Sequence, residues 1–275
     1  MELPIVKSKP KVEEPRKMFL FAQSKTGKTS ALSQLPNSLV IDLEDGADFY
    51  ECASINVKRI AKQEGKTLLE VLSDVKTSIL EANNKKGNPV YDFVIIDTTS
   101  VLEQIANEFG TSLYKKSAIG KNFFGSDVVT ELPQGSGYNW QRMAFDKLYK
   151  GFEALAGKCL VLSGHVKTSS INKEGKDLAA RDIQLTGKLK QMVCSDSDAI
   201  GYMYRNKDTD VNMISFKTSE QDLATGSRLS YLSGKDIKLS EMKEGKLVTY
   251  WEEIFPSLRK EAGKSAVEKN VLVSQ

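Results

Sequence analysis

The sequence predicts an α/β fold, in which helices flank a mostly parallel sheet and antiparallel strands are added near the C-terminus. An apolar strand over residues 18–21 leads through a tight loop into a helical pattern over 30–35. A second apolar run, over 91–99, reaches an acid where a buried parallel strand would meet the ligand edge of its sheet. After residue 199, strand patterns follow one another without helices between them, which indicates antiparallel pairing.

Composition narrows the class of protein. The chain has 275 residues, of which 40% are hydrophobic and 27% charged, so it can bury a sizeable core. A formal net charge of +3 is only mildly basic and does not by itself indicate a polyanionic partner. The 3 cysteines lie far apart, and the single histidine excludes multi-histidine metal sites. Because no run of about 18 apolar residues occurs, we expect a cytoplasmic protein without a membrane partner.

The expected organisation is one domain with loosely structured ends. Residues 1–17 carry prolines and charges without periodicity and are interpreted as an N-terminal arm. One folded domain is expected over 18–258, followed by a flexible charged tail over 259–275.

The loop after the first strand has the layout of a P-loop, because a strand, a tight turn, Gly-Lys-Thr and a helix follow in order. Backbone N–H groups and the positive end of the helix would surround a phosphate chain. Lys28 would reach the β- and γ-phosphates of ATP, and the Thr29 hydroxyl would bind Mg²⁺. Ala22 stands where the common pattern has its first glycine, and alanine is the smallest replacement. The expected nucleotide-binding residues are Ala22, Gln23, Ser24, Lys25, Thr26, Gly27, Lys28, Thr29 and Ser30.

The elements between the P-loop and the middle of the chain follow from hydrophobic periodicity. A capping box of Ser100 and Glu103 is expected to begin a helix that extends to about residue 113. The preceding elements are, in order, strand 38–42, short strand 55–60, amphipathic helix 68–82, loop 83–88 and strand 91–99.

The second half alternates long polar stretches with regular elements. The stretch 114–137 is aperiodic and long enough to be functional or disordered. The further elements are helix 140–156, strand 159–164, polar loop 166–186, short helix 187–194, strands 199–205, 213–217 and 228–232, and closing helix 250–258.

Two acids are candidates for chemistry. Asp97 ends the most apolar strand, so it is interpreted as the Walker B acid that holds Mg²⁺ opposite Thr29; the alternative is a helix cap. Many P-loop ATPases place glutamate after that aspartate, but this chain has Thr98. The best other acid is Glu44, at the end of the strand expected next to the P-loop strand, where it is either a catalytic group or a solvated loop acid.

His165 and two basic segments complete the candidates. His165 directly follows a strand, where it would contact the γ-phosphate or serve as a structural histidine. No nucleophile elbow surrounds Ser163, so triad chemistry is not indicated. Cations interleaved with aromatic rings suit a nucleic-acid strand, although acids dilute both segments and loop lysines are usually only solvating. The candidate DNA contacts are Lys115, Lys116, Lys121, Phe123, Phe124, Lys167, Lys173, Lys176 and Arg181.

With these motifs identified, the chain resembles the RecA-like P-loop ATPases from about residue 17 to residue 258. More closely, it is similar to a small phage-encoded branch grouped with the Sak single-strand annealing proteins. The resemblance is carried by the P-loop and by the stretches 40–48 (VIDLEDGAD), 93–103 (FVIIDTTSVLE) and 161–167 (VLSGHVK). It implies a RecA-like P-loop NTPase core with ATP and Mg²⁺ as cofactors. Glu44, Lys28 and His165 would be catalytic, with His165 sensing the γ-phosphate.

The same resemblance implies partners. Residues 114–138 and 168–181 would line a path for single-stranded DNA, and self-association into an oligomer or filament would place cations of one protomer at the ATP site of the next. Lys217 and Arg228 are the candidates for these cations. A single-strand binding protein is a further candidate partner. The expected activity is a DNA-stimulated ATPase in phage-type recombination or annealing.

Two alternatives remain open. The chain could belong to another DNA-processing machine, such as a helicase loader or motor, although neither a glutamate after Asp97 nor an arginine-sensor domain is visible. It could also be a nucleotide-gated binding module without meaningful hydrolysis.

Overall fold

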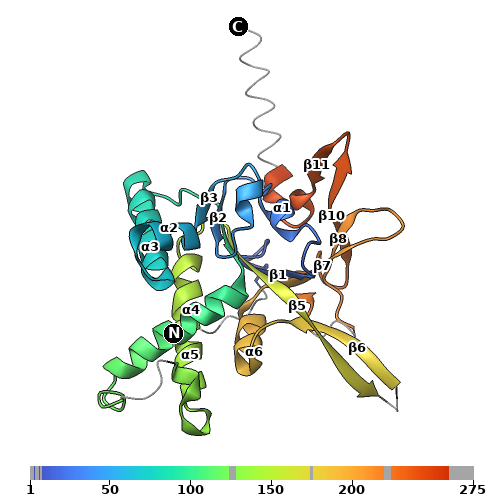
Figure 1. Ribbon diagram of the computed structural model, residues 1–275. Helices are drawn as coiled ribbons and strands as arrows, with labels where there is room; N and C mark the ends of the chain where they lie inside the picture. Colours follow the sequence, from blue (N-terminus) through green and yellow to red (C-terminus); the bar gives the residue numbers. More distant parts are fainter. Residues whose placement is uncertain are drawn as a thin grey trace.

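A computed structural model describes residues 3, 6, 8–123, 128–173, 176–219 and 224–259, with backbone alone for residues 169–173 and 176–179 (Figure 1). The predicted tail over 259–275 therefore lies, apart from Arg259, outside the described residues, as do parts of the predicted arm. Within the described ranges, every helix is too short or too polar to traverse a lipid bilayer.

A parallel core forms the middle of an 11-stranded sheet. β1 lies between two parallel neighbours, β7 and β5, and β5 pairs on its other side with β4, the strand that ends at Asp97. Because all these strands run the same way, their carboxyl ends meet at one edge, where ligands bind in open α/β sheets. In spatial order the core strands are β7 (Ala199–Arg205), β1 (Lys17–Ala22), β5 (Cys159–Lys173), β4 (Phe93–Asp97), β2 (Ser38–Asp42) and β3 (Ser54–Asn56).

Antiparallel strands extend this core, which confirms the predicted fold class. Three of them continue the sheet beyond β7, and β9 pairs with the amino end of β7. β6 pairs with the second half of β5 as a long hairpin that projects past the neighbouring strands (Figure 1). The added strands are β6 (Lys176–Ile183), β8 (Asn212–Ser215), β9 (Gly226–Ser227), β10 (Asp236–Lys243) and β11 (Lys246–Thr249).

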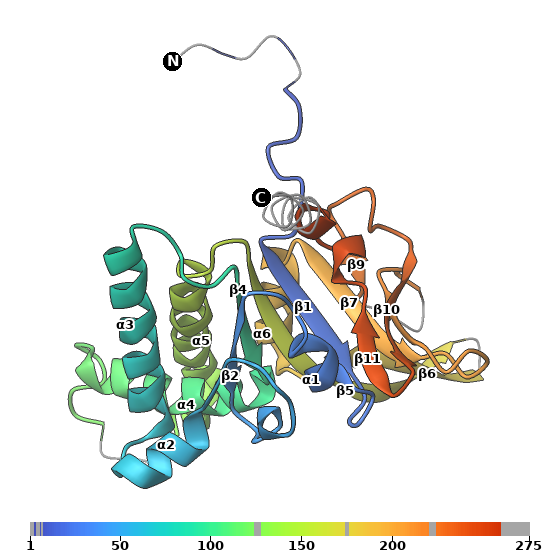
Figure 2. The same ribbon diagram turned by 90° about the horizontal axis from the view of Figure 1, so that it is seen from above.

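Helices cover both faces of the sheet. Figure 2 shows α2 to α5 gathered on one side, with α1 and α6 on opposite faces of β1. The α-helices are α1 (Lys28–Leu32), α2 (Val57–Glu64), α3 (Leu68–Lys86), α4 (Thr99–Lys116), α5 (Gly137–Glu153) and α6 (Gly187–Asp196). Short 3₁₀ turns are η1 (Ala47–Phe49), η2 (Val129–Glu131), η3 (Pro133–Gly135) and η4 (Trp251–Glu253).

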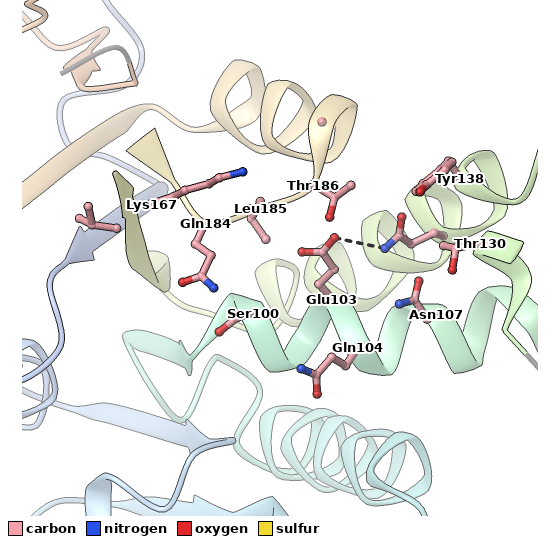
Figure 3. Close-up of a pocket in the computed structure, with 13 residues that line it drawn as sticks. Ser100, Glu103, Gln104, Asn107, Thr130, Tyr138, Lys167, Gln184, Leu185 and Thr186 are labelled. Atoms are coloured by element: carbon pink, nitrogen blue, oxygen red, sulfur yellow. Dashed lines mark hydrogen bonds between the residues drawn. The ribbon is translucent and has the colours of Figure 1, made fainter. Parts of the chain in front are cut away.

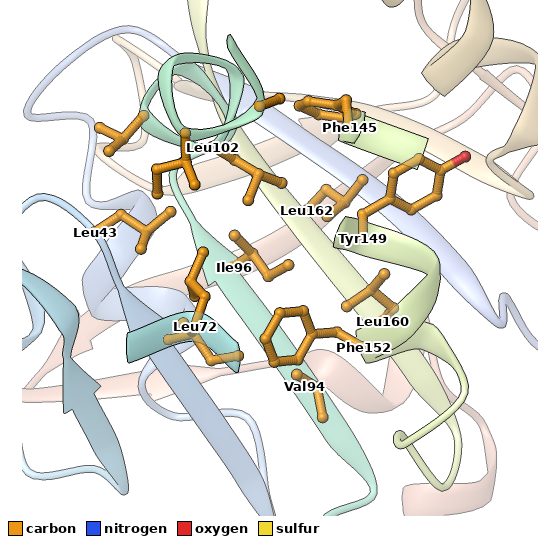
Figure 4. Packing of buried hydrophobic residues seen from close by; sticks show 14 of the residues in the cluster. Leu43, Leu72, Val94, Ile96, Leu102, Phe145, Tyr149, Phe152, Leu160 and Leu162 are labelled. Atoms are coloured by element: carbon orange, nitrogen blue, oxygen red, sulfur yellow. The ribbon is translucent and has the colours of Figure 1, made fainter. Parts of the chain in front are cut away.

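The alternation of side chains along β1 divides the core into two clusters. Phe19 and Phe21 point to the face covered by α2 to α6, whereas Met18 and Leu20 point to the face covered by α1 and the closing segment. β2, β4, β7 and the first part of β5 alternate in the same way and are apolar on both faces, whereas short β3 has Ile55 as its one apolar residue. Figure 4 shows the larger cluster, in which strand residues meet helix residues. Its labelled members include Val94, Ile96, Leu160, Leu162, Leu102, Phe145, Tyr149 and Phe152.

The closing segment of the described chain contacts both the P-loop helix and the residues before β1. The Trp251 indole N–H donates to the carbonyl oxygen of Ala31 in α1 at 2.9 Å. The hydroxyl of Ser257 donates to the carboxylate of Glu14 at 2.9 Å, so residues 14–17 pack with the domain rather than beside it. The Trp251 contact ties α1 to the closing segment, and the Ser257 contact ties that segment to the residues before β1.

Several predicted boundaries were wrong for local reasons. The predicted strand 55–60 is a strand only to Asn56, whose side chain accepts from the Arg59 N–H and caps α2. The predicted loop 83–88 continues α3 to Lys86, because the stop signal is Gly87 at φ 78°. The capping box of Ser100 and Glu103 does not form. α4 begins at Thr99 without a side-chain cap, and Glu103 instead accepts from Gln141 of α5 at 3.2 Å.

The largest difference is the predicted polar loop over 166–186. β5 continues past its predicted end at residue 164 and pairs with β6, so the stretch is mainly a hairpin. Its residues are largely polar, so no apolar alternation indicated strands. The predicted strand 228–232 is instead a turn that follows β9. The strands β10 and β11 were not predicted. The predicted closing helix 250–258 is reduced mainly to η4.

Replacing Phe152 by alanine should destabilise the fold by about 3–5 kcal/mol, because it opens a cavity where the ring is 1% exposed between α5 and the sheet. Phe49→Ala is the control, since that ring is 84% exposed and its loss should cost less than about 0.5 kcal/mol. Urea denaturation of both variants measures the difference. Equal stabilities would contradict the packing described here.

Candidate active site

The P-loop joins β1 to α1 at the carboxyl edge of the sheet. Gly27 has φ 96°, and a Cβ there would lie 3.2 Å from Asn212 Nδ2 and from Ser30 Oγ, so only glycine fits. The Thr26 hydroxyl donates to the Gln23 carbonyl at 2.8 Å and closes the loop. Ala22, in contrast, is still part of extended β1 and does not have positive φ. Its methyl group therefore causes no backbone strain.

Four polar side chains meet at the carboxyl end of β4. Lys28 Nζ lies 2.8 Å from Asp97 Oδ1 and also donates to the Ser163 hydroxyl, which in turn donates to Asp97. The Thr29 hydroxyl donates to the other carboxylate oxygen at 2.7 Å. The side chains of Lys28 and Asp97 are only 7% and 4% exposed. Two P-loop residues thus bind the acid that ends β4.

Asp97 is held ionised by this surrounding. Burial by itself would raise the pKa of Asp97, but the Lys28 ammonium, with hydrogen bonds from Ser163 and Thr29, outweighs burial and lowers it. A carboxylate that stays charged in a buried position needs such partners. The same negative oxygens are the kind of ligand that Mg²⁺ prefers.

Glu44 is positioned by a turn that Asp42 organises. The Asp42 carboxylate accepts from the backbone N–H groups of Glu44 at 2.9 Å and Ala47 at 2.8 Å. Asp42 is also the register partner of Asp97, so the acids at the ends of β2 and β4 lie side by side. We predicted that β2 is next to the P-loop strand, and this was wrong, because β5 and β4 lie between them. Glu44 therefore approaches the site from the Asp97 side.

Glu44 is engaged by neighbours on two elements. It accepts from the Thr98 hydroxyl at 2.7 Å, and His165 Nε2 lies 3.1 Å from its second oxygen. The hydrogen bond with His165, assisted by the one from Thr98, lowers the pKa of Glu44 to about 2, although burial acts in the opposite direction. Glu44 is therefore an ionised hydrogen-bond acceptor at neutral pH. Ser163, Thr98 and Ser100 were not predicted for this network; a serine inside the apolar run CLVLSG was the one available signal.

The donor set fits Mg²⁺ together with a triphosphate. One hydroxyl, Thr29, and one carboxylate, Asp97, lie within a hydrogen bond of each other beside the loop. The described residues contain no group of three or more histidine, cysteine or acidic side chains that could hold a metal alone. Mg²⁺ in such a site takes its remaining ligands from phosphates and water. Residues Lys28, Thr29 and Asp97 would hold the ion and the phosphates.

The candidate DNA contacts fall into two separate groups. Lys115, Lys116, Lys121 and Phe123 lie at the far end of α4, where the Phe123 ring packs edge-on against Tyr114 at 5.2 Å. The β5–β6 hairpin is on the opposite side of the molecule in both views (Figures 1 and 2).

The second group is on that hairpin. Lys167 is exposed, and the Arg181 guanidinium lies 4.7 Å from the Tyr202 ring. Lys173 and Lys176 pair near its tip, but their side chains, like all of Phe124, lie outside the described residues. The structure therefore does not bring the predicted contacts together on one surface.

Lys217 and Arg228 lie away from the P-loop of their own chain. Lys217 pairs with Asp236, and Arg228 lies 3.4 Å from Asp198, just before β7 begins. Both are toward the amino end of β7, at the edge of the sheet opposite the P-loop. If they act on a nucleotide, it is that of another protomer.

A polar cavity of about 760 Å³ opens next to Glu44 (Figure 3). It lies between α4, α5 and the segment that joins β6 to α6, and Ser100 in its wall is 3.4 Å from Glu44. The sequence held one signal for this cavity: four polar lining residues are spaced three and four apart, on one face of α4. These residues are Ser100, Glu103, Gln104 and Asn107. The labelled lining residues are Ser100, Glu103, Gln104, Asn107, Thr130, Tyr138, Lys167, Gln184, Leu185 and Thr186.

Comparisons with known proteins identify one family and similar solved structures. A family described as "AAA domain" matches residues 14–232. No curated protein matches the chain. Among solved structures, the crystal structure of the RadB recombinase is similar at a TM-score of 0.40 and 12% sequence identity, over 86% of this chain and 92% of that chain.

The ionised state of Glu44 should contribute stability that depends on pH. Its folded pKa of about 2 lies below the ordinary 4.5, so the contribution is complete above about pH 5 and is lost as the pH falls toward 2. Glu44→Gln should cost on the order of 1 kcal/mol at pH 7, after allowance for a one-third exposed side chain, and almost nothing near pH 2. Urea denaturation across this range measures it, with Glu51→Gln as an exposed control. A penalty independent of pH would rule out the contribution.

Proposed function

The chain belongs to the AAA domain family, and from this premise we propose that it is a RecA-like ATPase that binds ATP with Mg²⁺ at its P-loop and hydrolyses it. One observation carries the proposal. Lys28 of the loop, Asp97 at the end of β4 and Glu44 beyond β2 converge at one edge of the sheet, although they are far apart in the sequence. Phosphoryl transfer to water uses such a set: a cation at the phosphates, an acid that holds the metal ion and a residue that orients the attacking water.

Each residue has a distinct task in the proposed reaction. Bound ATP supplies a terminal phosphoryl group that is transferred to water. The Lys28 ammonium, now paired with Asp97, turns to the phosphate oxygens and neutralises their charge. Asp97 and the Thr29 hydroxyl are then free to hold Mg²⁺.

Glu44 orients the attacking water by accepting its hydrogen bond. Because its pKa is about 2, it acts chiefly as a fixed negative acceptor, and positioning rather than strong basicity is its contribution. His165 holds the carboxylate from the β5 side and is the group best placed to exchange that contact for the γ-phosphate. Such an exchange would reach the β5–β6 hairpin directly, because His165 begins the part of β5 that enters it.

Single-stranded DNA is the proposed partner, in recombination or annealing of the phage type. The exposed Lys167 supports this role, because it follows His165, which contacts Glu44, by two residues. The amide-lined cavity supports it as well, because Ser100 in its wall is 3.4 Å from Glu44. Amide and hydroxyl groups can meet the edges of unpaired bases. Self-association is proposed because Lys217 and Arg228 lie far from the P-loop of their own chain. A single-strand binding protein is a further proposed partner.

A nucleotide-gated binding module is the second candidate. It is favoured by the direct hydrogen bonds of Glu44 with Thr98 and His165, which occupy the carboxylate that would otherwise orient the water. In that case nucleotide binding alone would change the hairpin, and hydrolysis would be negligible.

Two substitutions separate binding from turnover. Lys28→Ala should weaken ATP binding by about 100-fold or more, because it leaves the phosphates without their main cation and Asp97 without its partner. Glu44→Gln should preserve ATP affinity but lower the rate of phosphate release by about 10²–10⁴-fold. Lys62→Ala, which removes an exposed lysine of α2, is the control. Normal turnover by Glu44→Gln would refute the catalytic assignment; no release by the unaltered chain would favour the module.

DNA stimulation should depend on the hairpin and not on the end of α4. Lys167→Ala should reduce the stimulation of phosphate release by single-stranded DNA several-fold and weaken its salt dependence by about one phosphate contact. Lys116→Ala, on the opposite side of the molecule, is the matched control. Titration with single- and double-stranded DNA at several stated salt concentrations measures both effects. Equal losses in the two variants, or preference for duplex, would contradict the proposed path.

A further inference from the structure

Phe49 and Tyr50 are neighbouring aromatic residues that lie outside the core. The Phe49 ring is 84% exposed, the largest exposed fraction of any aromatic side chain among the described residues, and Tyr50 is 39% exposed. Both lie in the turn between β2 and β3. A ring that stays in water contributes little to the fold of its own chain, whereas aromatic rings are common anchors of protein interfaces.

The acidic loop, residues 44–50, holds Phe49 in a fixed position. The Asp45 carboxylate accepts from the Asn56 side chain at 2.8 Å, and Asp48 lies 2.8 Å from the Arg59 guanidinium. Three residues of the loop are acids and none is basic. Because the turn is already ordered, a partner that binds the ring would not have to fix its position first.

A cavity of about 520 Å³ opens at the opposite edge of the sheet. It lies between α6 and residues 224–228, beside the amino end of β7, whereas the acidic loop follows the carboxyl end of β2. Cys194, Ile200 and Ala224 form the apolar part of its lining. Burial raises the pKa of the Cys194 thiol to about 11, so this part is uncharged at neutral pH.

The charges that face solvent around this cavity are positive. Lys190 pairs with Asp182 and Arg228 with Asp198, but in each pair the acid is the more buried partner. The side chains of Lys190 and Arg228 are 29% and 61% exposed, against 17% and 11% for the two acids. An apolar cavity with a positive rim complements an aromatic ring flanked by acids.

The two complementary surfaces cannot meet within one chain, because they lie at opposite edges of the sheet. The N-terminal arm passes the cavity, where the Arg16 N–H donates to Asp198 at 3.0 Å. Leu3 and Val6 of that arm are nevertheless 75% and 83% exposed, so neither is seated in it. In a heterologous assembly, one surface of each protomer binds a different surface of the next. Complementary surfaces at opposite edges fit this kind of assembly.

We propose that the cavity between α6 and residues 224–228 binds Phe49 of a second copy of this chain, with Lys190 and Arg228 facing the acids of its loop. The inference rests on the proposed self-association and names its two surfaces. It gives Arg228 the task of binding the acidic loop of the next protomer and not its nucleotide.

This contact adjoins the P-loop site of the copy that supplies Phe49. The acidic loop contains Glu44, and a Cβ at Gly46 would lie 3.6 Å from Thr29 Oγ1. Assembly and the nucleotide site therefore share one short loop.

Sedimentation velocity of the full chain over a range of concentrations, with and without Mg–ATP, tests the assignment. Phe49→Ala removes the ring, and Ala224→Phe fills the cavity, so each should weaken self-association by about tenfold or more. Ile119→Ala is the matched control, because Ile119 is an equally exposed apolar side chain, at 83%, just beyond α4. It should associate as the unaltered chain does.

Mixing the two variants gives a sharper test. The Phe49→Ala chain keeps its cavity and the Ala224→Phe chain keeps its ring, so together they can form one contact and no more. The expected result is a 1:1 dimer in the mixture, at a concentration where each variant alone is a monomer. Such a dimer supports the assignment and shows that both variants are folded.

The outcomes separate this inference from the function on which it rests. If the unaltered chain assembles and both variants assemble equally well, or if their mixture stays monomeric, the assignment is overturned and the proposed self-association stands. If Ala224→Phe alone blocks assembly, another segment, such as the N-terminal arm of the second copy, occupies the cavity and the assignment of Phe49 is overturned. An unaltered chain that is monomeric throughout ends both this inference and the proposed self-association, while phosphate release still decides the ATPase proposal.

Discussion

The buried pair of Lys28 and Asp97 is the interaction on which the rest of the site depends. Two opposite charges that are 7% and 4% exposed would be costly unless each is satisfied, and here Ser163 and Thr29 supply the remaining hydrogen bonds. The pair joins the loop after β1 to the end of β4 across the intervening β5. The ion pair can form only if β1 and β4 end at the same edge of the sheet, so the site depends on the parallel arrangement of these strands.

Glu44 adds a second constraint, because its neighbours belong to elements that lead away from the site. Thr98 begins the turn into α4, Ser100 lines the polar cavity, and His165 starts the extension of β5 toward the hairpin. A change at the phosphate side of Glu44 would therefore be transmitted to both surfaces proposed for the DNA strand. The coupling is direct, because Thr98 and His165 each form a hydrogen bond with the Glu44 carboxylate, at 2.7 Å and 3.1 Å.

Several elements were predictable because their signal is local. β2 was predicted to the residue, and β4 was found within a slightly longer run, since buried parallel strands are continuous apolar stretches. The P-loop was identified from its glycine and lysine, and Gly27 indeed needs its left-handed φ. The β5–β6 hairpin, β10 and β11 were missed or mistaken for loops, because exposed polar strands are stabilised by backbone pairing that leaves no hydrophobic pattern.

The sequence by itself determined the fold class and the P-loop motif and marked Asp97 and Glu44 as candidate acids, because these depend on residue type and on spacing along short segments. Tertiary structure alone decided that Ser163, Thr98 and His165 surround those acids, that Tyr202 and Tyr204 adjoin the loop, and that the predicted DNA contacts separate into two groups. The physical reason is strand order. β5 lies between β1 and β4, and β7 lies on the other side of β1, an arrangement set by packing between distant segments and not by any local pattern.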